Sequence, residues 1–357
     1  MDIVTHGLAS LAVARGFFPR AGKTAMASAV LAGTIADLDW LSSYFGPSAF
    51  LTWHRTYTHS VLTVFLVSAV LPAILLAGIF WGGVGFEVPV PMGAIPDDPR
   101  AMRKPMVRAV LLALFLAPLS AAVVHTAMDA CQSSGVMLLW PFSSKYFAAD
   151  WLPRIDPWIL TILIACIALP ELLLLVGSEI GAKAKKPRGQ TGAIIGLALV
   201  FIYVGARAIL HSNALALMES RTFHGETPRR ASAFPETLSL VTWHGIIETE
   251  SALDEIDVNA AAPDTFDAES SQRLFKPEPS PALDAARNTR AAKRFLATAQ
   301  IPKASLEKTE AGYIVVLRDL RYAAAGETQH EIAALIQLDL NNKVTSQELV
   351  WARDLHR

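Results

Sequence analysis

Residues 53–80, WHRTYTHSVLTVFLVSAVLPAILLAGIF, place two histidines directly before a continuous apolar run. Residues 60–80 carry no charged side chain and are long enough to cross a bilayer, which takes about 20 helical residues. Ionisable groups are expensive in hydrocarbon, so they persist beside a membrane mainly where they pair, ligate or react. The stretch therefore predicts a membrane helix that begins next to two histidines, His54 and His59, which we expect to pair, bind a ligand or react.

The composition of the whole chain is that of a membrane protein with a polar portion. Of the 357 residues 52% are hydrophobic and only 18% are charged, with a mean hydropathy of +0.37. Soluble domains carry about 25% charged residues. The net charge of −1 argues against binding driven by phosphate neutralisation, so no nucleic-acid partner is expected. The two cysteines form no CxxC pattern, which excludes a structural zinc site of the cysteine type.

Five further apolar runs accompany the first. Residues 106–128, 158–176 and 192–211 are each long enough to span a membrane, whereas 3–18 and 21–44 are shorter or interrupted. We interpret the last two as a helical hairpin that turns at Pro19 and Gly22. The sequence thus predicts a mainly α fold, a polytopic membrane bundle of about six helices over residues 1–211.

The composition changes beyond residue 211, where charged residues, prolines and polar turns become common. Residues 282–299 have the pattern of a helix. Strands are predicted at 238–248, 312–322 and 331–340, with a last strand that ends near Trp351. Residues 212–357 are therefore expected to form a small α+β extramembrane domain.

Basic residues predict the orientation of the bundle, because lysine and arginine in short loops favour the cytoplasmic side. With six helices threaded in order, all three basic clusters fall on one face, and the C-terminal domain falls on the other. We therefore expect a multi-pass protein of a bacterial inner membrane whose C-terminal domain is periplasmic. The clusters are Arg15, Arg20 and Lys23; Arg100, Arg103, Lys104 and Arg108; and Lys183, Lys185, Lys186 and Arg188.

The same threading gathers eight acidic and histidine residues at the outer helix ends. They form four short clusters that are separated in sequence but converge on one predicted face. We expect all eight to contribute to one metal centre at the membrane–water boundary. The residues are Asp2 and His6, Asp37 and Asp39, His54 and His59, and His125 and Asp129.

Two of the clusters have helical spacing. His125 and Asp129 are four residues apart, so both project from one helix face and can hold one metal ion. The alternative is a helix-end histidine beside a solvated carboxylate. Asp2 and His6 share the spacing, but an aspartate at the start of a helix also suits the positive end of the helix dipole.

The other two clusters need a less regular backbone. Asp37 and Asp39 are two residues apart and point in different directions on a regular helix. One can ligate a metal while the other orients a histidine, and we assign Asp39 to catalysis as well as to the metal site. Arg55 is the second catalytic candidate, because its planar fork of donors suits a phosphate. The alternative for Arg55 is a salt bridge to Asp37 or Asp39.

Imidazoles and carboxylates without thiolates favour zinc, with manganese or iron as alternatives. Four histidines and four carboxylates suffice for two or three ions. A bound metal acidifies a water molecule and polarises a phosphoryl oxygen, so the expected reaction is hydrolysis of a phosphoester. Because the centre is predicted to lie at the membrane–water boundary, we expect the substrate to be a small or lipid-linked phosphoester. Membrane lipids are expected to surround the site.

Five short motifs carry a resemblance to a known family: MDIVTH at 1–6, ADLD at 36–39, HRTYTHS at 54–60, WPFS at 140–143 and IDPW at 155–158. With the His125–Asp129 pair, residues 1–210 resemble the bacterial inner-membrane metal-dependent hydrolases typified by YdjM and YbcI. This chain departs from the family pattern at one position: it has Ala36 where the family usually has a proline before Asp-x-Asp. Through His125 and Asp129 the family is similar to zinc phospholipase C and P1-type nucleases, which implies phosphoester hydrolysis. Asp156, inside the last motif, is either a further ligand or the cap of a helix, and we favour the cap.

Two alternatives to a hydrolase remain at this stage. A non-catalytic membrane protein can use a metal only to staple helices, and a closed coordination sphere would favour that reading. A transporter is the third possibility, because intramembrane ionisable groups are typical of transport pathways. The residues themselves do not separate a catalytic from a structural metal.

Overall fold

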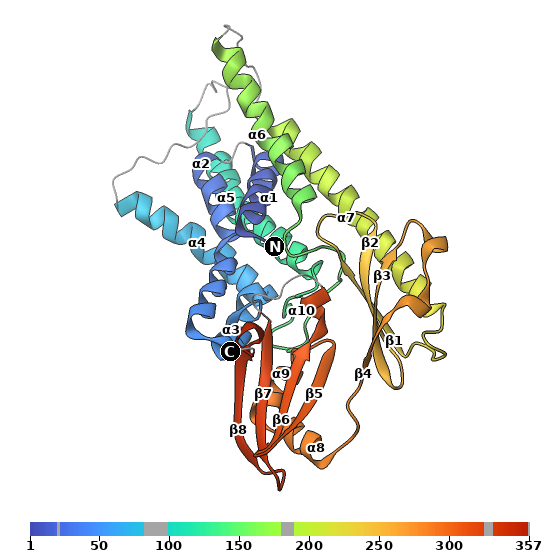
Figure 1. The fold of residues 1–357 in the computed structure, drawn as a ribbon. Helices are drawn as coiled ribbons and strands as arrows, with labels where there is room; N and C mark the ends of the chain where they lie inside the picture. The colour runs from blue at the N-terminus through green and yellow to red at the C-terminus, as the bar shows by residue number, and fades with distance from the viewer. Residues whose placement is uncertain (20–21, 82–98, 180–188, 325–330, 356–357) are drawn as a thin grey trace.

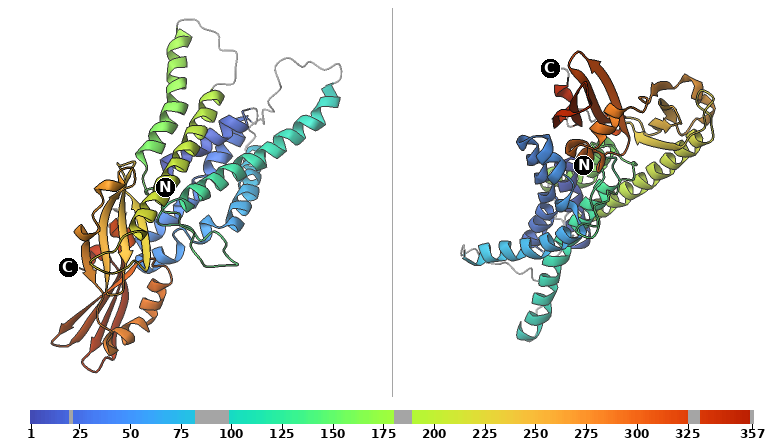
Figure 2. Two further views of the ribbon diagram at one scale, coloured as in Figure 1. Left: turned by 90° about the vertical axis from the view of Figure 1, so that its right-hand side faces the viewer. Right: turned by 90° about the horizontal axis from the view of Figure 1, so that it is seen from below.

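The computed structural model describes residues 1–19, 22–81, 99–179, 189–324 and 331–355 (Figure 1). A mostly helical N-terminal part is followed by two four-stranded antiparallel sheets. Both sheets extend from one end of the helical part (Figure 2). Arg20 and the basic cluster at 183–188, which were used to predict the orientation, lie outside the described residues.

The described helices support fewer membrane spans than the sequence predicted. Among the described residues three helices are long and apolar enough to cross a bilayer, within Val61–Gly78, Leu111–Ala130 and Gln190–Glu219. Six spans are therefore not supported. The helices are α1 Ile3–Phe17, α2 Gly22–Ala32, η1 Ile35–Phe45, α3 Pro47–Trp53, η2 Tyr57–His59, α4 Val61–Trp81, α5 Pro99–Ala130, α6 Pro157–Glu179 and α7 Gln190–Glu219.

The predicted hairpin is shorter than its two apolar runs suggested. At 1.5 Å per residue, the 15 residues of α1 extend about 22 Å, short of a hydrocarbon core of about 30 Å. The second run breaks where α2 ends at Ala32 and the chain turns into the 3-10 helix η1. The turn lies against α1: a Cβ on Gly33 would come 1.8 Å from the Ser10 hydroxyl. The chain just after α2 therefore packs closely against α1.

Each sheet follows the chain in simple antiparallel order. The first contains β1 Arg230–Pro235, β2 Thr242–Glu248, β3 Ala252–Asn259 and β4 Gln272–Phe275. The second contains β5 Pro302–Thr309, β6 Gly312–Asp319, β7 Ile332–Asp339 and β8 Val344–Trp351. The sequence predicted parts of β2, β6, β7 and β8 but not the other four strands. Its helix at 282–299 is two short helices, α8 Pro281–Arg287 and α9 Arg290–Leu296, because Thr289 caps a new helix.

The sheets are attached to the helical part at several points. α7 is continuous across the predicted domain boundary at 211/212, and its buried Arg207 donates to the carbonyls of Trp151, Ser239 and Leu240. From the C-terminal part of the chain, Arg294 of α9 donates to the backbone carbonyl of Ser48 in α3, 3.0 Å away. The second sheet therefore lies against the loops and short helices that follow η1.

Candidate metal centre

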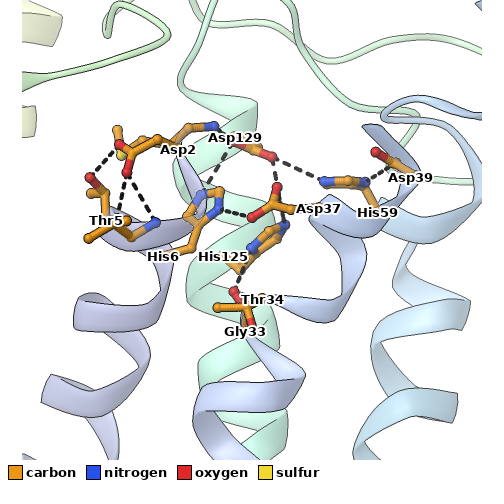
Figure 3. A network of polar contacts seen from close by, with 12 residues as sticks. Asp2, Thr5, His6, Gly33, Thr34, Asp37, Asp39, His59, His125 and Asp129 are labelled. Carbon is orange, nitrogen blue, oxygen red and sulfur yellow. Dashed lines mark hydrogen bonds and ion pairs between the residues drawn. The ribbon is translucent and has the colours of Figure 1, made fainter. Parts of the chain in front are cut away.

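Three histidine rings converge on Asp129 at one end of the helical part (Figure 3). His6 comes from α1, His59 from η2, and His125 from the same face of α5 as Asp129. The Nε2 atoms of His6, His59 and His125 lie 3.4, 3.1 and 3.7 Å from the nearer Asp129 oxygens. All four side chains are buried. Their convergence confirms that elements far apart in sequence meet here.

The second nitrogen of each ring is occupied by a partner that fixes the ring. The Nδ1 of His125 lies 2.8 Å from the Gly33 carbonyl, an obligate acceptor, so Nδ1 carries the proton and Nε2 has a free lone pair. The Nδ1 of His6 lies 2.8 Å from Asp37, and that of His59 lies 3.3 Å from Asp39. Ligating histidines are typically oriented in this way by a carboxylate or a carbonyl.

The inward-facing atoms lie close to one another, with His59 Nε2 3.1 Å from Asp129 Oδ2, but have no well-oriented hydrogen bond to any residue that the structure describes. The Nε2 atoms of His6, His59 and His125 and the Oδ2 of Asp129 are buried, and none has a hydrogen-bond partner among the described residues. A buried unsatisfied polar atom costs about 1–3 kcal/mol. His6, Asp37, His125 and Asp129 each offer one ligand atom, and these atoms lie within 4.8 Å of one another. A donor set of this chemistry fits a bound cation such as zinc.

Asp37 and Asp39 lie two residues apart in the 3-10 helix η1 and have different partners. With about three residues per turn, residues two apart point in clearly different directions. Asp37 contacts His6 and places its Oδ1 3.9 Å from the Nε2 of His125. Asp39 lies farther out, where its Oδ1 is 2.7 Å from the Nδ1 of His54 and its Oδ2 accepts the backbone N–H of Arg55. His54 and Asp39 thus support the cluster from outside it.

Asp2 is positioned as a helix cap and lies apart from the ligand cluster. Its carboxylate accepts the backbone N–H groups of Val4 and Thr5 and the Thr5 hydroxyl at the start of α1. Asp156 caps α6 in the same manner, accepting N–H groups of Trp158 and Ile159, as the sequence indicated.

Arg55 enters the cluster in an unexpected way. Its backbone has a φ of +59°, and its buried guanidinium turns to Asp129 at 3.3 Å and to Gln132 Oε1 at 2.7 Å, not to the side chains of Asp37 or Asp39. Its Nη1 has no hydrogen-bond partner within the described part of the chain. The amino group of Met1 also contacts Asp129 and Gln132. One donor of Arg55 is therefore available beside the orphaned ligand atoms.

Three further residues at the site escaped the sequence analysis. Gln132 is held by the carbonyls of Pro153 and Arg154, and Gly33 supplies the acceptor for His125. Thr58 lies between Asp39 and His59, with its hydroxyl 2.9 Å from the ring nitrogen. None belongs to a residue type that signals metal chemistry. Only the three-dimensional arrangement identifies them.

The outer carboxylates are held in their charged form. Burial opposes ionisation of Asp39, but hydrogen bonds from His54 and His59 outweigh it and keep the pKa of Asp39 well below its usual range. Burial also opposes ionisation of Asp37, yet the contact with His6 lowers its pKa. Burial lowers the pKa of His54 to about 4. For His59 the carboxylates of Asp129 and Asp39 outweigh burial and raise the pKa to about 9.

Comparison with known proteins identifies both parts of the chain. Residues 281–356 match the YfhP C-terminal alpha/beta plait domain. A Bacillus subtilis (strain 168) protein described as uncharacterized protein YfhP is 28% identical over 174 residues, which cover 47% of this chain and 43% of the relative. The chain thus aligns with less than half of that relative's length. No solved structure matches the chain.

The helical part gives the more extensive match. Residues 1–214, more than half of the chain, match the family described as YdjM inner membrane protein, and they contain every residue of the cluster around Asp129. The family description and the three apolar helices together support a location in the inner membrane. The chain belongs to the YdjM inner membrane protein family.

Proposed function

We propose that the protein is a membrane-bound, metal-dependent hydrolase that cleaves phosphoesters at the outer face of the inner membrane. The observation that carries the proposal is a set of buried, convergent atoms: three imidazole nitrogens lie within 3.7 Å of the Asp129 carboxylate, and none of them has a hydrogen-bond partner among the described residues. Such groups are expensive unless a cation completes them. The idle Nη1 of Arg55 beside them adds a donor for an anionic substrate.

Each residue has a distinct role in this proposal. His6, His125, Asp129 and Asp37 would hold the metal, with His59 as a further ligand through the Nε2 that faces Asp129. Zinc is the first candidate, since imidazole and carboxylate without thiolate suit it, and manganese or iron are alternatives. A bound ion would supply a water molecule acidified to near-neutral pKa and polarise the phosphoryl oxygen.

Arg55 and Asp39 would serve the reaction without holding the ion themselves. The Nη1 of Arg55 would bind a non-bridging phosphate oxygen, and its Nη2 remains anchored by Gln132, so that the fork keeps its orientation. Asp39 would keep His59 aligned and accept from the Arg55 backbone, which fixes the strained conformation of that residue. Asp39 is thus a positioning residue, which modifies the role expected from its sequence motif.

One observation favours a second candidate, a metal that only staples the fold. The side chains of His6, His59 and Asp129 have no solvent exposure, and they come from three separate elements, as in a closed structural site. A closed site would leave no position for a water molecule. The two candidates differ in the role of Arg55. A catalytic site would use its unpaired Nη1 to bind substrate, whereas a structural metal site would not use that atom.

The discriminating experiment compares Arg55→Gln with Arg55→Lys in protein reconstituted in nanodiscs. Metal content is measured by elemental analysis, and turnover is measured with bis(p-nitrophenyl) phosphate. We expect stoichiometric metal in the wild type and a loss of turnover of about 100-fold or more in Arg55→Gln with metal retained, because the charged donor is gone. Stoichiometric metal without turnover in the wild type would support the second candidate, a metal with a purely structural role. Absence of transition metal from the wild type would overturn both candidates.

A further inference from the structure

A small cavity lies beside His125, between α2, η1, α4 and α5. It has a volume of about 140 Å³ and is lined mainly by Ala32, Ile35, Val64, Val67 and Ala122. His125 is part of its wall, so the cavity and the metal centre share a side chain. The cavity therefore adjoins the cluster around Asp129 through the His125 side chain.

The space exists because small side chains face one another. Ala32, Val64 and Ala122 pack together from α2, α4 and α5, and bulkier residues in their place would fill the gap. The outer rim includes Ile35, which is 39% exposed. The adjoining α4 contains a membrane-spanning segment, and Phe65 and Leu66 on that segment are exposed. The cavity thus opens next to a helix surface that suits lipid hydrocarbon.

Two of the three threonine hydroxyls that line the cavity have hydrogen-bond partners. Thr58 bonds to Asp39, and Thr63 donates to the Tyr57 carbonyl. A polar ligand group placed here would lose its hydration and find few partners, which is unfavourable. A hydrocarbon group would gain by leaving water. The chemistry of the wall therefore selects an apolar occupant.

We propose that this cavity holds the first carbons of a hydrocarbon chain esterified to the phosphate at the metal centre. The inference rests on the proposed function and deepens it, since it assigns lipid-linked phosphoesters as the substrate class. Its volume equals that of about four or five methylene-sized groups, if each takes the roughly 30 Å³ of a liquid water molecule. The chain would continue from there into the bilayer beside α4.

Alkylphosphonates test the proposal without relying on turnover. Methyl- to octylphosphonate are titrated into zinc-loaded, nanodisc-embedded protein, and the heat of binding is measured. Burial of one methylene group changes affinity by up to about fourfold. We expect affinity to rise by at least about tenfold from methyl to pentyl and then to level off, because later carbons leave the cavity. Simple partition into the bilayer would instead rise continuously to octyl.

Val64→Phe fills the cavity, and Val70→Phe on the same helix is the matched control, since Val70 is 51% exposed. Val64→Phe should bind methylphosphonate like the wild type and lose the gain from methyl to pentyl. Val70→Phe should keep that gain. If Val64→Phe fails to fold, the proposal is still tested by whether the affinity of the wild type levels off beyond pentylphosphonate. A flat series, or one that rises to octyl in every protein, overturns the inference.

The outcomes also separate this inference from the proposed function. Chain-dependent phosphonate binding without cleavage of any p-nitrophenyl alkyl phosphate would overturn the hydrolase and leave the cavity assignment standing. Cleavage of the methyl ester, with neither binding nor kcat/KM dependent on chain length, would overturn the cavity assignment and leave the hydrolase standing. Absence of phosphonate binding and of cleavage would overturn both.

Discussion

Trp351 packs edge-on against Phe50, with 5.5 Å between their ring centroids. The contact joins the last strand of the second sheet to α3. Phe50 also stacks on His54 at 4.4 Å, and His54 lies 2.7 Å from the Asp39 carboxylate that supports His59. A continuous series of contacts therefore leads from the C-terminal domain to the metal centre.

Trp351→Ala should lower zinc affinity by about three- to tenfold, because loss of the aromatic contact, about 0.5–1.5 kcal/mol, loosens His54 and Asp39. Affinity is measured by chelator competition in nanodiscs. Phe275→Ala, which truncates an exposed aromatic residue of the first sheet, is the control and should leave zinc affinity unchanged. Equal affinities in the two variants would show that the C-terminal domain does not support the site.

Three Asp→Asn substitutions should weaken metal binding more, the closer the substituted residue lies to the centre. Asp129→Asn should abolish stoichiometric metal, since Asp129 meets all three rings. Asp39→Asn should lower metal affinity about 10- to 100-fold, as expected of a residue that orients a ligand. Asp2→Asn should have little effect, because asparagine caps helices as well as aspartate does. Loss of metal in Asp2→Asn would contradict the capping role and restore Asp2 as a ligand.

Gly33→Ala should destabilise the protein by about 1–3 kcal/mol, because its Cβ would overlap the Ser10 hydroxyl on α1. The measurement is thermal unfolding in nanodiscs. Gly78→Ala is the matched control: no described atom lies within 4 Å of its added Cβ, and alanine favours a helix. The double variant Ser10→Gly/Gly33→Ala should recover much of the loss. An unchanged melting temperature in Gly33→Ala would show that α1 and α2 are not in close contact.

Asp150 should make stability depend on pH. Burial raises the pKa of Asp150 from 3.8 to about 6, so the folded state disfavours its charge. Stability from this residue is present below pH 4 and is lost as the pH rises to about 6, by at most about 3 kcal/mol. Asp150→Asn should therefore melt higher than the wild type at pH 7.5 and similarly at pH 4. Its left-handed φ of +58° also tolerates asparagine. Equal melting temperatures at pH 7.5 would contradict the shift.

The sequence predicted the features that depend on local spacing. His125 and Asp129 share a helix face because four residues make about one turn, and 60–80 is apolar enough to define α4. It predicted that Asp37 and Asp39 point in different directions and that one of them can orient a histidine, but not that Asp37 pairs with His6 and Asp39 with His54. Six spans are not supported among the described residues, and the second apolar run is interrupted where α2 ends at Ala32.

Other features depend on contacts between distant segments. Gln132 and Gly33 are ordinary residues until the fold places one beside Arg55 and the other beneath His125. Arg55 was expected near phosphate or near Asp37 and Asp39, and only the fold directs its guanidinium to Asp129. Local patterns thus predicted where polar residues lie along the helices, and tertiary packing decided which of them face the centre.

The convergence of His6 and His59 on Asp129 has a consequence for biogenesis. His6 and His59 are synthesised well before α5, which supplies His125 and Asp129. A nascent chain that stops before α5 therefore has histidines without the carboxylate on which they converge. If the cluster holds a metal as proposed, loading would have to wait until α5 has entered the bilayer and docked against α1. The ion, once bound, would mark a correctly inserted protein and distinguish it from chains stalled during insertion.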